Sequence, residues 1–444
     1  MSGGLRRLTV SVLCLFVLVF SISRAQAVEV RRVVAGDLEA WLVEDHLNPM
    51  IAVSIAFLGG AALDPSGKEG LARMTASVLD EGAGDMDSQA FQLRLEELSI
   101  TLQFDAGRDT FGGTLRTLTG NRDEAFALLK QALTAPRFDP EPVARMKSQL
   151  QALLRRQAEN PGSIANKRFF STVFPDHPYG RPVGGTEQSI AAITVDDMRT
   201  FVAERLTRDN LVIGVAGDIT PDELSRLLTS TFAELPEKAA PNGVPNTEAE
   251  AEAAIVVVEQ PARQSAIIFG QRGLKRDNPD YYAATVMNRI LGGGGFTSRL
   301  YQEVRDKRGL AYSVRTSLVP LAHAGLIVGS AGTANERAGE TIEVVRDQWR
   351  RMAEEGATAE ELADAKTYLV GSFPLRFTSN GSIAGILAAM QIYDLGIDYL
   401  DRRNALMEGV TLDDVNRVAE DVLDPSALTM IVVGEPEGLM VQQP

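Results

Sequence analysis

Two stretches of the sequence repeat each other and indicate how the chain is organised. Ile193-Thr-Val-Asp-Asp-Met198 leads through a helix-like segment to Asn210-Leu-Val-Ile-Gly-Val-Ala-Gly-Asp218. Val410-Thr-Leu-Asp-Asp-Val415 leads in the same way to Ala427-Leu-Thr-Met-Ile-Val-Val-Gly-Glu435. The matching threonines are 217 positions apart, and so are the matching glycines. One offset across a helix and a strand predicts two copies of a single α/β module.

The segments around the repeat mix strands and helices. Residues 28–43 alternate apolar and polar positions like two short strands, and residues 51–58 form a third strand-like run. Further strands are expected over residues 100–104 and 110–118, and helices over about residues 70–79, 88–98, 122–134 and 141–159. We therefore predict an α+β fold with two homologous α/β halves, each a mixed, largely antiparallel sheet with helices packed on it.

A segment rich in Pro, Ala, Glu and Asn separates the two copies. This composition, over residues 236–254, is typical of an extended, exposed linker. The predicted domains are therefore residues 28–235 and residues 255–444.

The N-terminus has the pattern of a secretory signal peptide. Arg6 and Arg7 precede an apolar run over residues 10–20, and Ala25-Gln-Ala27 offers small residues for cleavage. The run is too short for a membrane span. We expect residues 1–27 to be removed and the mature chain to be periplasmic, without a stable membrane span.

Composition narrows the possible functions. The 444 residues are 45% hydrophobic and 23% charged, as in soluble globular proteins with more than one domain. There are 44 basic and 59 acidic residues, and the net charge of −15 disfavours binding to nucleic acids or anionic membranes. The single cysteine, Cys14, lies within the predicted signal, so the mature chain has no thiol chemistry.

A second segment carries the candidate functional residues. It reads Leu291-Gly-Gly-Gly-Gly-Phe-Thr-Ser-Arg-Leu-Tyr-Gln-Glu-Val-Arg-Asp-Lys-Arg-Gly-Leu-Ala-Tyr-Ser-Val314. The glycine run lacks the spacing of a nucleotide-binding loop, and we expect a flexible loop at a substrate cleft. We expect Thr297 or Ser298 to cap a helix that Gly309 ends, with a strand following.

Arg305 and Tyr312 of this segment are expected to project toward one point. Together they would donate hydrogen bonds to a developing oxyanion. The alternative is that Arg305 only complements the helix dipole while Tyr312 packs against its neighbours.

This segment resembles the C-terminal signature of the insulinase/pitrilysin family of zinc metallopeptidases, in its short bacterial and mitochondrial-processing-peptidase-like branch. In that family an arginine and a tyrosine seven positions apart contact the substrate near the scissile bond. Arg305 and Tyr312 match this spacing, whereas Arg308 does not. The resemblance covers essentially the whole mature chain, including Phe174-Pro-Asp-His-Pro-Tyr-Gly180, and implies two halves that face each other like a clamshell.

The same resemblance implies a zinc motif that is degenerate here. Active members carry H-x-x-E-H on a helix that opens after a Gly-Leu-Ala stretch, with two histidines holding zinc and the glutamate activating water. After Gly70-Leu-Ala72, Arg73 and Ser77 stand at the histidine positions and Ala76 at the glutamate position. Leu153 stands at the position of the third ligand, a glutamate in the family. We expect no metal in this chain.

No other residues of the sequence form a metal-binding pattern. The three histidines, His46, His177 and His323, lie far apart, and none has a second His or Cys at ligand spacing. We expect them in turns, loops or strand ends. Asp80 and Glu81 follow the degenerate motif and are interpreted as capping or solvated acids.

Loss of the zinc motif beside an intact Arg/Tyr pair predicts the non-zinc subunit of a heterodimeric periplasmic metalloendopeptidase, inactive alone. A homologous zinc-bearing partner would supply zinc, water and general base. Arg305 and Tyr312 would bind a peptide or unfolded protein and stabilise the tetrahedral oxyanion. The peptide would add as a strand to an exposed sheet edge, which by family likeness we expect at residues 100–104.

Two alternatives remain open. One is a non-proteolytic binding or scaffold protein, like the core proteins of respiratory complexes that resemble this family. The other is an independent zinc peptidase with unorthodox ligands, which the sequence supports little.

Overall fold

A computed structural model describes residues 29–439, apart from residues 242 and 251–253. The predicted signal peptide, residues 1–27, lies outside these described residues. Within the described part, no helix combines the length and the apolar character needed to cross a membrane.

The N-terminal half is built on a six-stranded sheet with the order β1-β2-β6-β3-β5-β4. Only β2 and β6 pair in parallel, and the other neighbours are antiparallel. The strands are β1 (Arg31–Ala35), β2 (Leu38–Glu44), β3 (Met50–Leu58), β4 (Thr101–Ala106), β5 (Thr110–Leu118) and β6 (Leu211–Gly217).

The C-terminal half repeats this plan with five strands in the order β7-β11-β8-β10-β9. Its single parallel pair is β7 with β11, so β11 occupies the place that β6 has in the first sheet. The strands are β7 (Ile255–Glu259), β8 (Gln264–Arg272), β9 (Ala311–Pro320), β10 (Gly325–Ala334) and β11 (Thr429–Gly434). The predicted α+β class, with two mixed and largely antiparallel sheets, is confirmed.

The helices follow the same two-part order. Those of the N-terminal half are α1 (Leu71–Ala76), α2 (Ser88–Glu97), α3 (Arg122–Thr134), α4 (Pro140–Ala158), α5 (Pro161–Val173), α6 (Glu187–Ala192), α7 (Val195–Arg205) and α8 (Pro221–Phe232). Those of the C-terminal half are α9 (Tyr281–Asn288), α10 (Ala338–Glu355), α11 (Ala359–Gly371), α12 (Asn380–Ile392), α13 (Tyr399–Glu408) and α14 (Leu412–Val422). Helix α1 is shorter than the predicted helix over residues 70–79.

The repeated sequence forms the same local structure twice, as α7 with β6 and as α14 with β11. The side chains of Thr194 and Thr411 cap the two helices, and each forms a reciprocal capping box with an aspartate three residues later. Gly217 and Gly434 end the two strands with positive φ angles of 134° and 157°. A Cβ atom on Gly217 would lie 2.1 Å from the carbonyl oxygen of Met50, so only glycine fits there.

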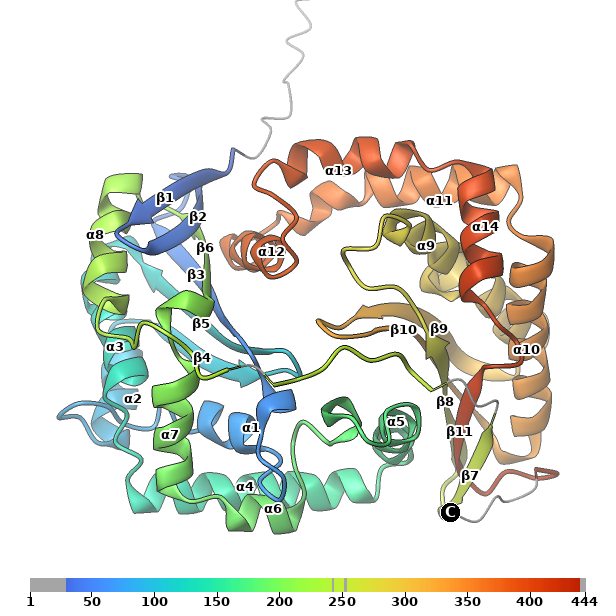
Figure 1. The fold of residues 1–444 in the computed structure, drawn as a ribbon, viewed down its shortest axis with the longest axis horizontal. Coiled ribbons are helices and arrows are strands. Elements are labelled where there is room, and N and C mark those ends of the chain that lie inside the picture. The colour runs from blue at the N-terminus through green and yellow to red at the C-terminus, as the bar shows by residue number, and fades with distance from the viewer. Residues whose placement is uncertain (1–28, 242, 251–253, 440–444) are drawn as a thin grey trace, which may run out of the picture.

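Each half covers the inner face of the other half's sheet with a helix. Helix α5 packs on β8 and β11, whereas α12 packs on β3 and β6 (Figure 1). A Cβ atom on Gly214 of β6 would lie 2.2 Å from the carbonyl oxygen of Ala384 of α12, which shows how closely the helix approaches. Phe169 of α5 and Leu387 of α12 are fully buried in the two resulting apolar clusters.

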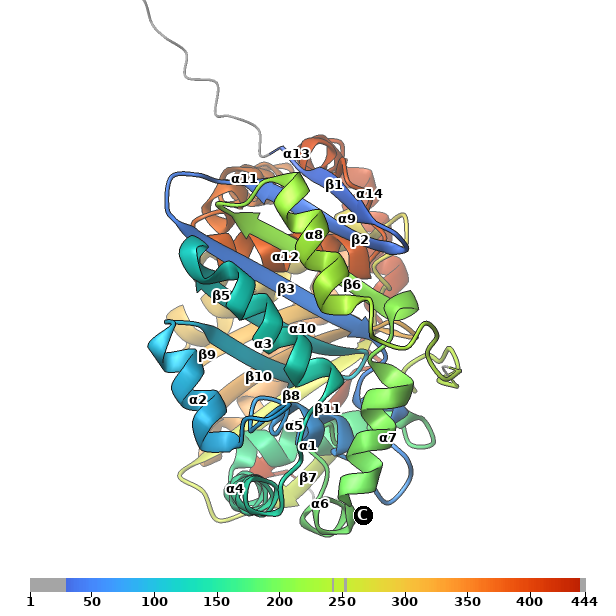
Figure 2. The ribbon, with the colours of Figure 1, turned by 90° about the vertical axis from the view of Figure 1, so that its left-hand side faces the viewer.

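The outer faces of the sheets carry the remaining cores. Helices α3 and α8 lie over the outer face of the first sheet (Figure 2). Helices α9, α10 and α14 cover the second sheet around the fully buried Trp349. The two halves face each other across the middle of the molecule, as in the expected clamshell (Figure 1).

The segment between the halves is extended but is not free. Where it is described, residues 236–254 contain no helix or strand. The backbone N–H of Thr247 donates to His323 (2.9 Å), and that of Glu250 donates to Val173 (2.9 Å). Ala249 is buried. Most of the described residues of this segment are nevertheless exposed, so it is extended and exposed as expected, while these contacts hold it against both halves.

Candidate functional site

Arg305 lies on a short π-helix, η7 (Tyr301–Asp306), which packs against β9. The helix is held from inside by Val304, which is fully buried in the second core. Gly309 adopts the predicted left-handed conformation, with a φ angle of 59°, after the helix has ended. The chain then enters β9 at Ala311.

The predicted capping of this helix is wrong. Neither Thr297 nor Ser298 accepts a hydrogen bond from the first turn. Their hydroxyl groups instead donate to the carbonyl oxygens of Gly294 and Gly295, at 3.3 and 2.9 Å. These bonds hold the two hydroxyl groups to the preceding glycine run.

A β-bulge sets the direction of Tyr312. Ser313 pairs with Gly332 and Ala311 pairs with Thr333, so Tyr312 is left between them without a partner in the register. Regular alternation from the buried Val314 would bury residue 312, but the bulge places Ala311 in the core instead. The Tyr312 side chain is consequently 79% exposed.

The structure brings Arg305 and Tyr312 together. The guanidinium carbon of Arg305 lies 4.8 Å from the ring centre of Tyr312 and 4.9 Å from that of Tyr301. Arg305 also donates through Nη1 to the Tyr301 hydroxyl. Cation–π contacts with two rings hold the guanidinium in one place while its other N–H groups bond no described residue. This arrangement offers hydrogen-bond donors to an incoming carbonyl oxygen or oxyanion, and the role of the pair toward a substrate stays a prediction.

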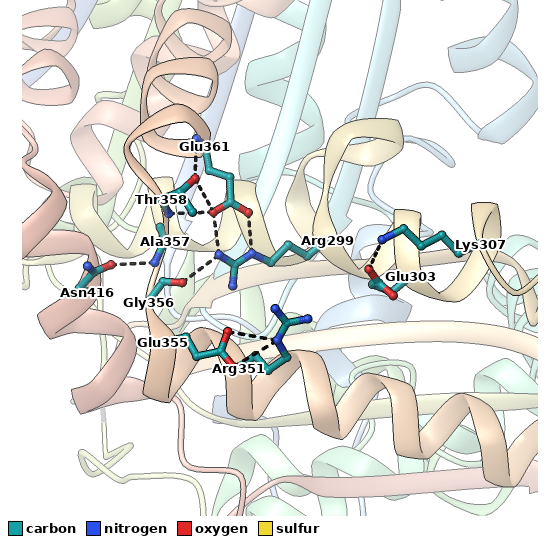
Figure 3. Close-up of polar contacts among 10 residues, drawn as sticks. All are labelled: Arg299, Glu303, Lys307, Arg351, Glu355, Gly356, Ala357, Thr358, Glu361 and Asn416. Carbon is teal, nitrogen blue, oxygen red and sulfur yellow. Dashed lines mark hydrogen bonds and ion pairs between the residues drawn. The ribbon is translucent and has the colours of Figure 1, made fainter.

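Arg299 anchors the start of the segment that carries Arg305 (Figure 3). Its Nε and Nη2 atoms bond the two carboxylate oxygens of Glu361, each at 2.6 Å, and Nη2 also donates to the Gly356 carbonyl at 2.8 Å. Burial alone would raise the pKa of Glu361, but the hydrogen bonds from Arg299 and Thr358 outweigh it and hold that pKa below its usual value. The pair thereby ties η7 to the first turn of α11.

The other basic residues of the segment are engaged elsewhere. Lys307 and Arg308 both bond the Glu303 carboxylate, with the Lys307 ammonium at 2.6 Å, and they lower its pKa. Arg308 also donates to the Glu303 carbonyl at 2.9 Å. Arg308 is therefore committed to its own helix, which agrees with the choice of Arg305 as the functional arginine.

The glycine run is packed rather than open. A Cβ atom on Gly292 would lie 2.5 Å from the Thr316 hydroxyl of β9, so glycine lets the turn approach the strand. Phe296 is 74% exposed, and its ring meets that of Tyr301 edge-on at 5.0 Å. The run therefore presents an exposed aromatic ring beside the Arg305 and Tyr312 pair, and the expected flexible loop is in part a fixed turn.

The degenerate zinc positions offer no ligand. Arg73 and Ala76 lie on α1 and Ser77 follows it as the C-cap residue, with Ala76 only 3% exposed. The Ser77 hydroxyl donates to the Met74 carbonyl at 2.8 Å. Leu153 lies on α4 and is half-buried. A guanidinium, a methyl group, an engaged hydroxyl and an aliphatic chain do not fit a zinc ion.

No alternative metal centre is found. Among the described residues, no three His, Cys, Asp or Glu side chains are grouped so as to hold a metal ion. His46 bonds Asp218 (2.6 Å), while His177 contacts the Pro245 carbonyl (2.9 Å) and His323 contacts Asn246 (3.2 Å). The three histidines thus lie in loops and turns and bond separate partners.

The acids after the degenerate motif are not solvated, contrary to the sequence interpretation. Glu81 is 8% exposed and pairs with Arg145 at 2.7 Å, while Ser88 donates to the same carboxylate. Burial raises the pKa of Asp80 to about 6. The sequence did not show that Arg145, a partner on α4, reaches Glu81.

Asp64 fixes the start of α1. Its carboxylate accepts hydrogen bonds from the backbone N–H groups of Gly70 (2.8 Å) and Ala72 (3.0 Å). Burial raises the pKa of Asp64 to about 7, although these bonds act in the opposite direction. This buried carboxyl stabilises a helix that has lost its ligands.

Each sheet has two edge strands, β1 and β4 in the first sheet and β7 and β9 in the second. Strand β4 (Thr101–Ala106) is where the sequence placed an exposed edge, at residues 100–104. Strand β9 carries Tyr312 at its beginning. Both edges have backbone groups that no further strand pairs among the described residues.

Comparison with known proteins decides the family. A family profile described as the peptidase M16 inactive domain matches residues 192–369. The Helicobacter pylori protein named non-peptidase homolog YmxG is 31% identical over 336 residues, which cover 75% of this chain and 77% of that protein. The chain belongs to the M16 peptidase family. The predicted relation to zinc metallopeptidases is thereby confirmed.

Other relatives and solved structures are similar to this chain in sequence or in fold. A crystal structure of a peptidase M16 inactive domain from Pseudomonas fluorescens is 30% identical, with a TM-score of 0.87, over 94% of this chain and 99% of that one. An uncharacterized zinc protease of Streptomyces coelicolor is 32% identical, and the match spans 60% of this chain and 59% of that protein. Complex III2 from Candida albicans contains a chain with the same fold, with a TM-score of 0.77 over 93% of this chain and 97% of that one, at 16% identity.

The sequence analysis did not identify several of the residues that lie around Arg305. Tyr301 stands four positions before Arg305, which places both on one helical face and is the signal that could have found it. Phe296 and the Arg299 to Glu361 pair were not singled out. Arg299 and Glu361 are 62 positions apart in the sequence, and no local sequence pattern predicts such a contact.

Proposed function

We propose that this M16 chain is the non-zinc subunit of a heterodimeric periplasmic metalloendopeptidase. It completes a composite site in which a homologous, zinc-bearing chain supplies the metal, the attacking water and the general base. Arg305 and Tyr312 of this chain bind the substrate backbone and stabilise the charge that develops on its carbonyl oxygen.

One contrast carries the proposal. Arg73, Ala76, Ser77 and Leu153 offer no zinc ligand. Arg305, in contrast, keeps free N–H groups among the described residues and lies against the exposed Tyr312. A fixed, exposed donor pair has a chemical use only if another molecule brings the reacting group to it.

The description of the relatives supports an inactive single chain. The family profile and the Pseudomonas fluorescens structure are both described as an inactive domain, and the Helicobacter pylori relative as a non-peptidase homolog. The Streptomyces coelicolor relative is named a zinc protease. Relatives named as a peptidase and relatives named as a non-peptidase are thus both similar to this chain. This supports a pair of related subunits of which only one is a zinc protease.

The test is reconstitution. The chain is co-expressed with a zinc-motif homologue from the same genome, and peptidase activity and zinc content are measured for each chain and for the mixture. We expect activity in the mixture, with zinc on the partner only, and none from this chain alone. A stable complex whose activity equals that of the partner alone would contradict the composite site.

A second candidate is a non-proteolytic scaffold. It is favoured by the likeness to a chain of Candida albicans complex III2 and by the name of the Helicobacter pylori relative. In that case Arg305→Ala and Tyr312→Phe leave partner binding and function unchanged, which the same reconstituted mixture measures.

A further inference from the structure

A cavity of about 630 Å³ lies between the two halves and is not part of the Arg305 site. Its apolar wall comes from the end of β3, the β9–β10 hairpin and the end of α12, with Leu58, Leu318, Leu321 and Ile392 among the lining residues. Leu58 lies on the same face of β3 as Ala52, which α12 covers. The cavity therefore opens on the inner side of the sheets, where the halves meet.

Two charged groups, Arg108 and Asp109, line this largely apolar space. Arg108, in the turn between β4 and β5, stacks its guanidinium on the Phe170 ring at 3.6 Å and donates through Nε to the Tyr179 carbonyl at 3.2 Å. Its Nη1 and Nη2 groups bond no described residue. Burial lowers the pKa of Arg108 to about 10, so the group stays charged at neutral pH.

The neighbouring carboxylate does not neutralise Arg108 directly. Both oxygens of Asp109 are engaged, one accepting from the Tyr179 hydroxyl at 2.6 Å and the other from the Ala322 N–H at 3.0 Å. These bonds fasten the β9–β10 hairpin to the N-terminal half and give the cavity a fixed wall. The Nη groups of Arg108 thus remain available to a ligand that brings its own acceptor.

The cavity lies in line with the proposed site. Strand β9 begins beside Tyr312 and ends with Leu318, Val319 and Pro320, which line the cavity. Six residues separate Tyr312 from Leu318, which is about 20 Å along a strand. An extended peptide that lies along this edge strand with one part at Tyr312 reaches the cavity with its end.

We propose that this cavity binds the C-terminus of a peptide, with the terminal carboxylate on Arg108 and an apolar last side chain against Leu58, Leu321 and Ile392. The inference rests on the proposed function, because it takes the ligand to be a peptide. Charge and shape support it. A carboxylate pairs with both free Nη groups of a guanidinium, and the aliphatic residues of the lining accept an aliphatic side chain.

The test measures binding to the full chain without a partner. The probe is a fluorescein-labelled peptide of about seven small residues ending in leucine, prepared with a free C-terminal carboxylate and as the C-terminal amide. We expect the free acid to bind at least tenfold more tightly than the amide in fluorescence anisotropy, since a charge-assisted pair is lost in the amide.

Variants locate the binding. Arg108→Gln removes the guanidinium, whereas Ala389→Phe fills the cavity and leaves Arg108 and its contacts in place, so it serves if the first variant does not fold. Each should weaken binding of the free acid at least tenfold. Arg226→Gln, which removes an exposed arginine from α8 on the outer face, should change it less than twofold.

Equal binding of the acid and the amide would overturn the inference, and so would no binding of either peptide. If decanoate binds while neither peptide does, the cavity is assigned to fatty acids instead. A parallel assay measures the cleavage of C-terminally amidated peptides by the reconstituted complex that carries Ala389→Phe. Amidated peptides cannot form the carboxylate pair with Arg108, so their cleavage tests the proposed function independently of the cavity.

Discussion

The region around α1 and the region around η7 and β9 lie in opposite halves of the molecule and have diverged in what they expose. Around α1, the former ligand positions are filled by side chains that are buried, half-buried or bonded to their own helix. Around η7, Tyr312 and Phe296 stand exposed while their backbone is fixed by a bulge and a packed turn. The comparison teaches that both regions keep the fold, whereas only the region around η7 presents exposed aromatic rings beside an arginine.

The largest loss of activity is expected when Arg305, a basic residue of the η7 region, is replaced. In the reconstituted complex, Arg305→Ala should lower kcat/KM by roughly 100-fold or more, the loss typical for one donor to an oxyanion. Stability should change little, because the described contacts of the guanidinium are limited to the side chains of Tyr301 and Tyr312.

Arg308→Ala is the matched control, since Arg308 lies three residues away and bonds only Glu303. It should leave kcat/KM within about threefold, because its guanidinium is held at Glu303 rather than against Tyr312. Equal losses in the two variants would show that general basicity of the helix, rather than the position of Arg305, matters.

A smaller loss of activity is expected when the Arg299 to Glu361 pair, which anchors η7, is broken. Arg299→Ala breaks the pair with Glu361, whose side chains are 16% and 29% exposed, and should lower the free energy of unfolding by about 2–3 kcal/mol in urea titrations. Arg145→Ala breaks the pair with Glu81 in the other half. Only Arg299→Ala should also lower kcat of the complex at temperatures where both variants are folded. Equal kcat values would mean that the anchor does not position Arg305.

The pH dependence of stability should differ in sign between the regions. Asp64 near α1 has its pKa raised to about 7, so the folded chain binds more protons than the unfolded chain between about pH 4 and pH 7. Its contribution to the free energy of unfolding therefore falls as the pH rises through that range, and Asp80 adds to the same trend. Glu361 near η7 has a lowered pKa, and its contribution is lost only as the pH falls below the usual glutamate range.

Thermal unfolding between pH 5 and pH 7.5 checks this difference. Asp64→Asn should reduce the decrease in Tm over this interval by a few degrees, whatever its effect on Tm at one pH. An unchanged pH profile in Asp64→Asn would assign the dependence to other groups.

The smallest expected effects test what the halves still share. Thr194→Ala and Thr411→Ala remove the same capping box at equivalent helices, and each should cost about 1 kcal/mol in urea unfolding. Similar values would support the equivalence of the two modules. A cost confined to one variant would show that the repeat is no longer structurally equivalent.

Local patterns account for what could be predicted from the sequence. The repeat, the left-handed Gly309 and the close approach of Arg305 and Tyr312 all follow from residues near one another in the chain. The bulge at Tyr312 could not be predicted, because it depends on the register with β10. The salt bridge of Glu81 likewise depends on how α4 packs, and the Ser298 hydroxyl bonds the Gly295 carbonyl instead of capping the helix.

The exchange of helices α5 and α12 also bears on how such a chain arose. A protein consisting of one half would expose both an apolar inner sheet face and an unattached apolar helix. Two identical copies would satisfy each other by trading helices, which is the geometry of a domain-swapped dimer. Fusing the copies through residues 236–254 turns that association into an intramolecular one at high effective concentration. In one fused chain the two copies can also differ in sequence, and here α1 offers no zinc ligand while η7 and β9 present Arg305 and Tyr312.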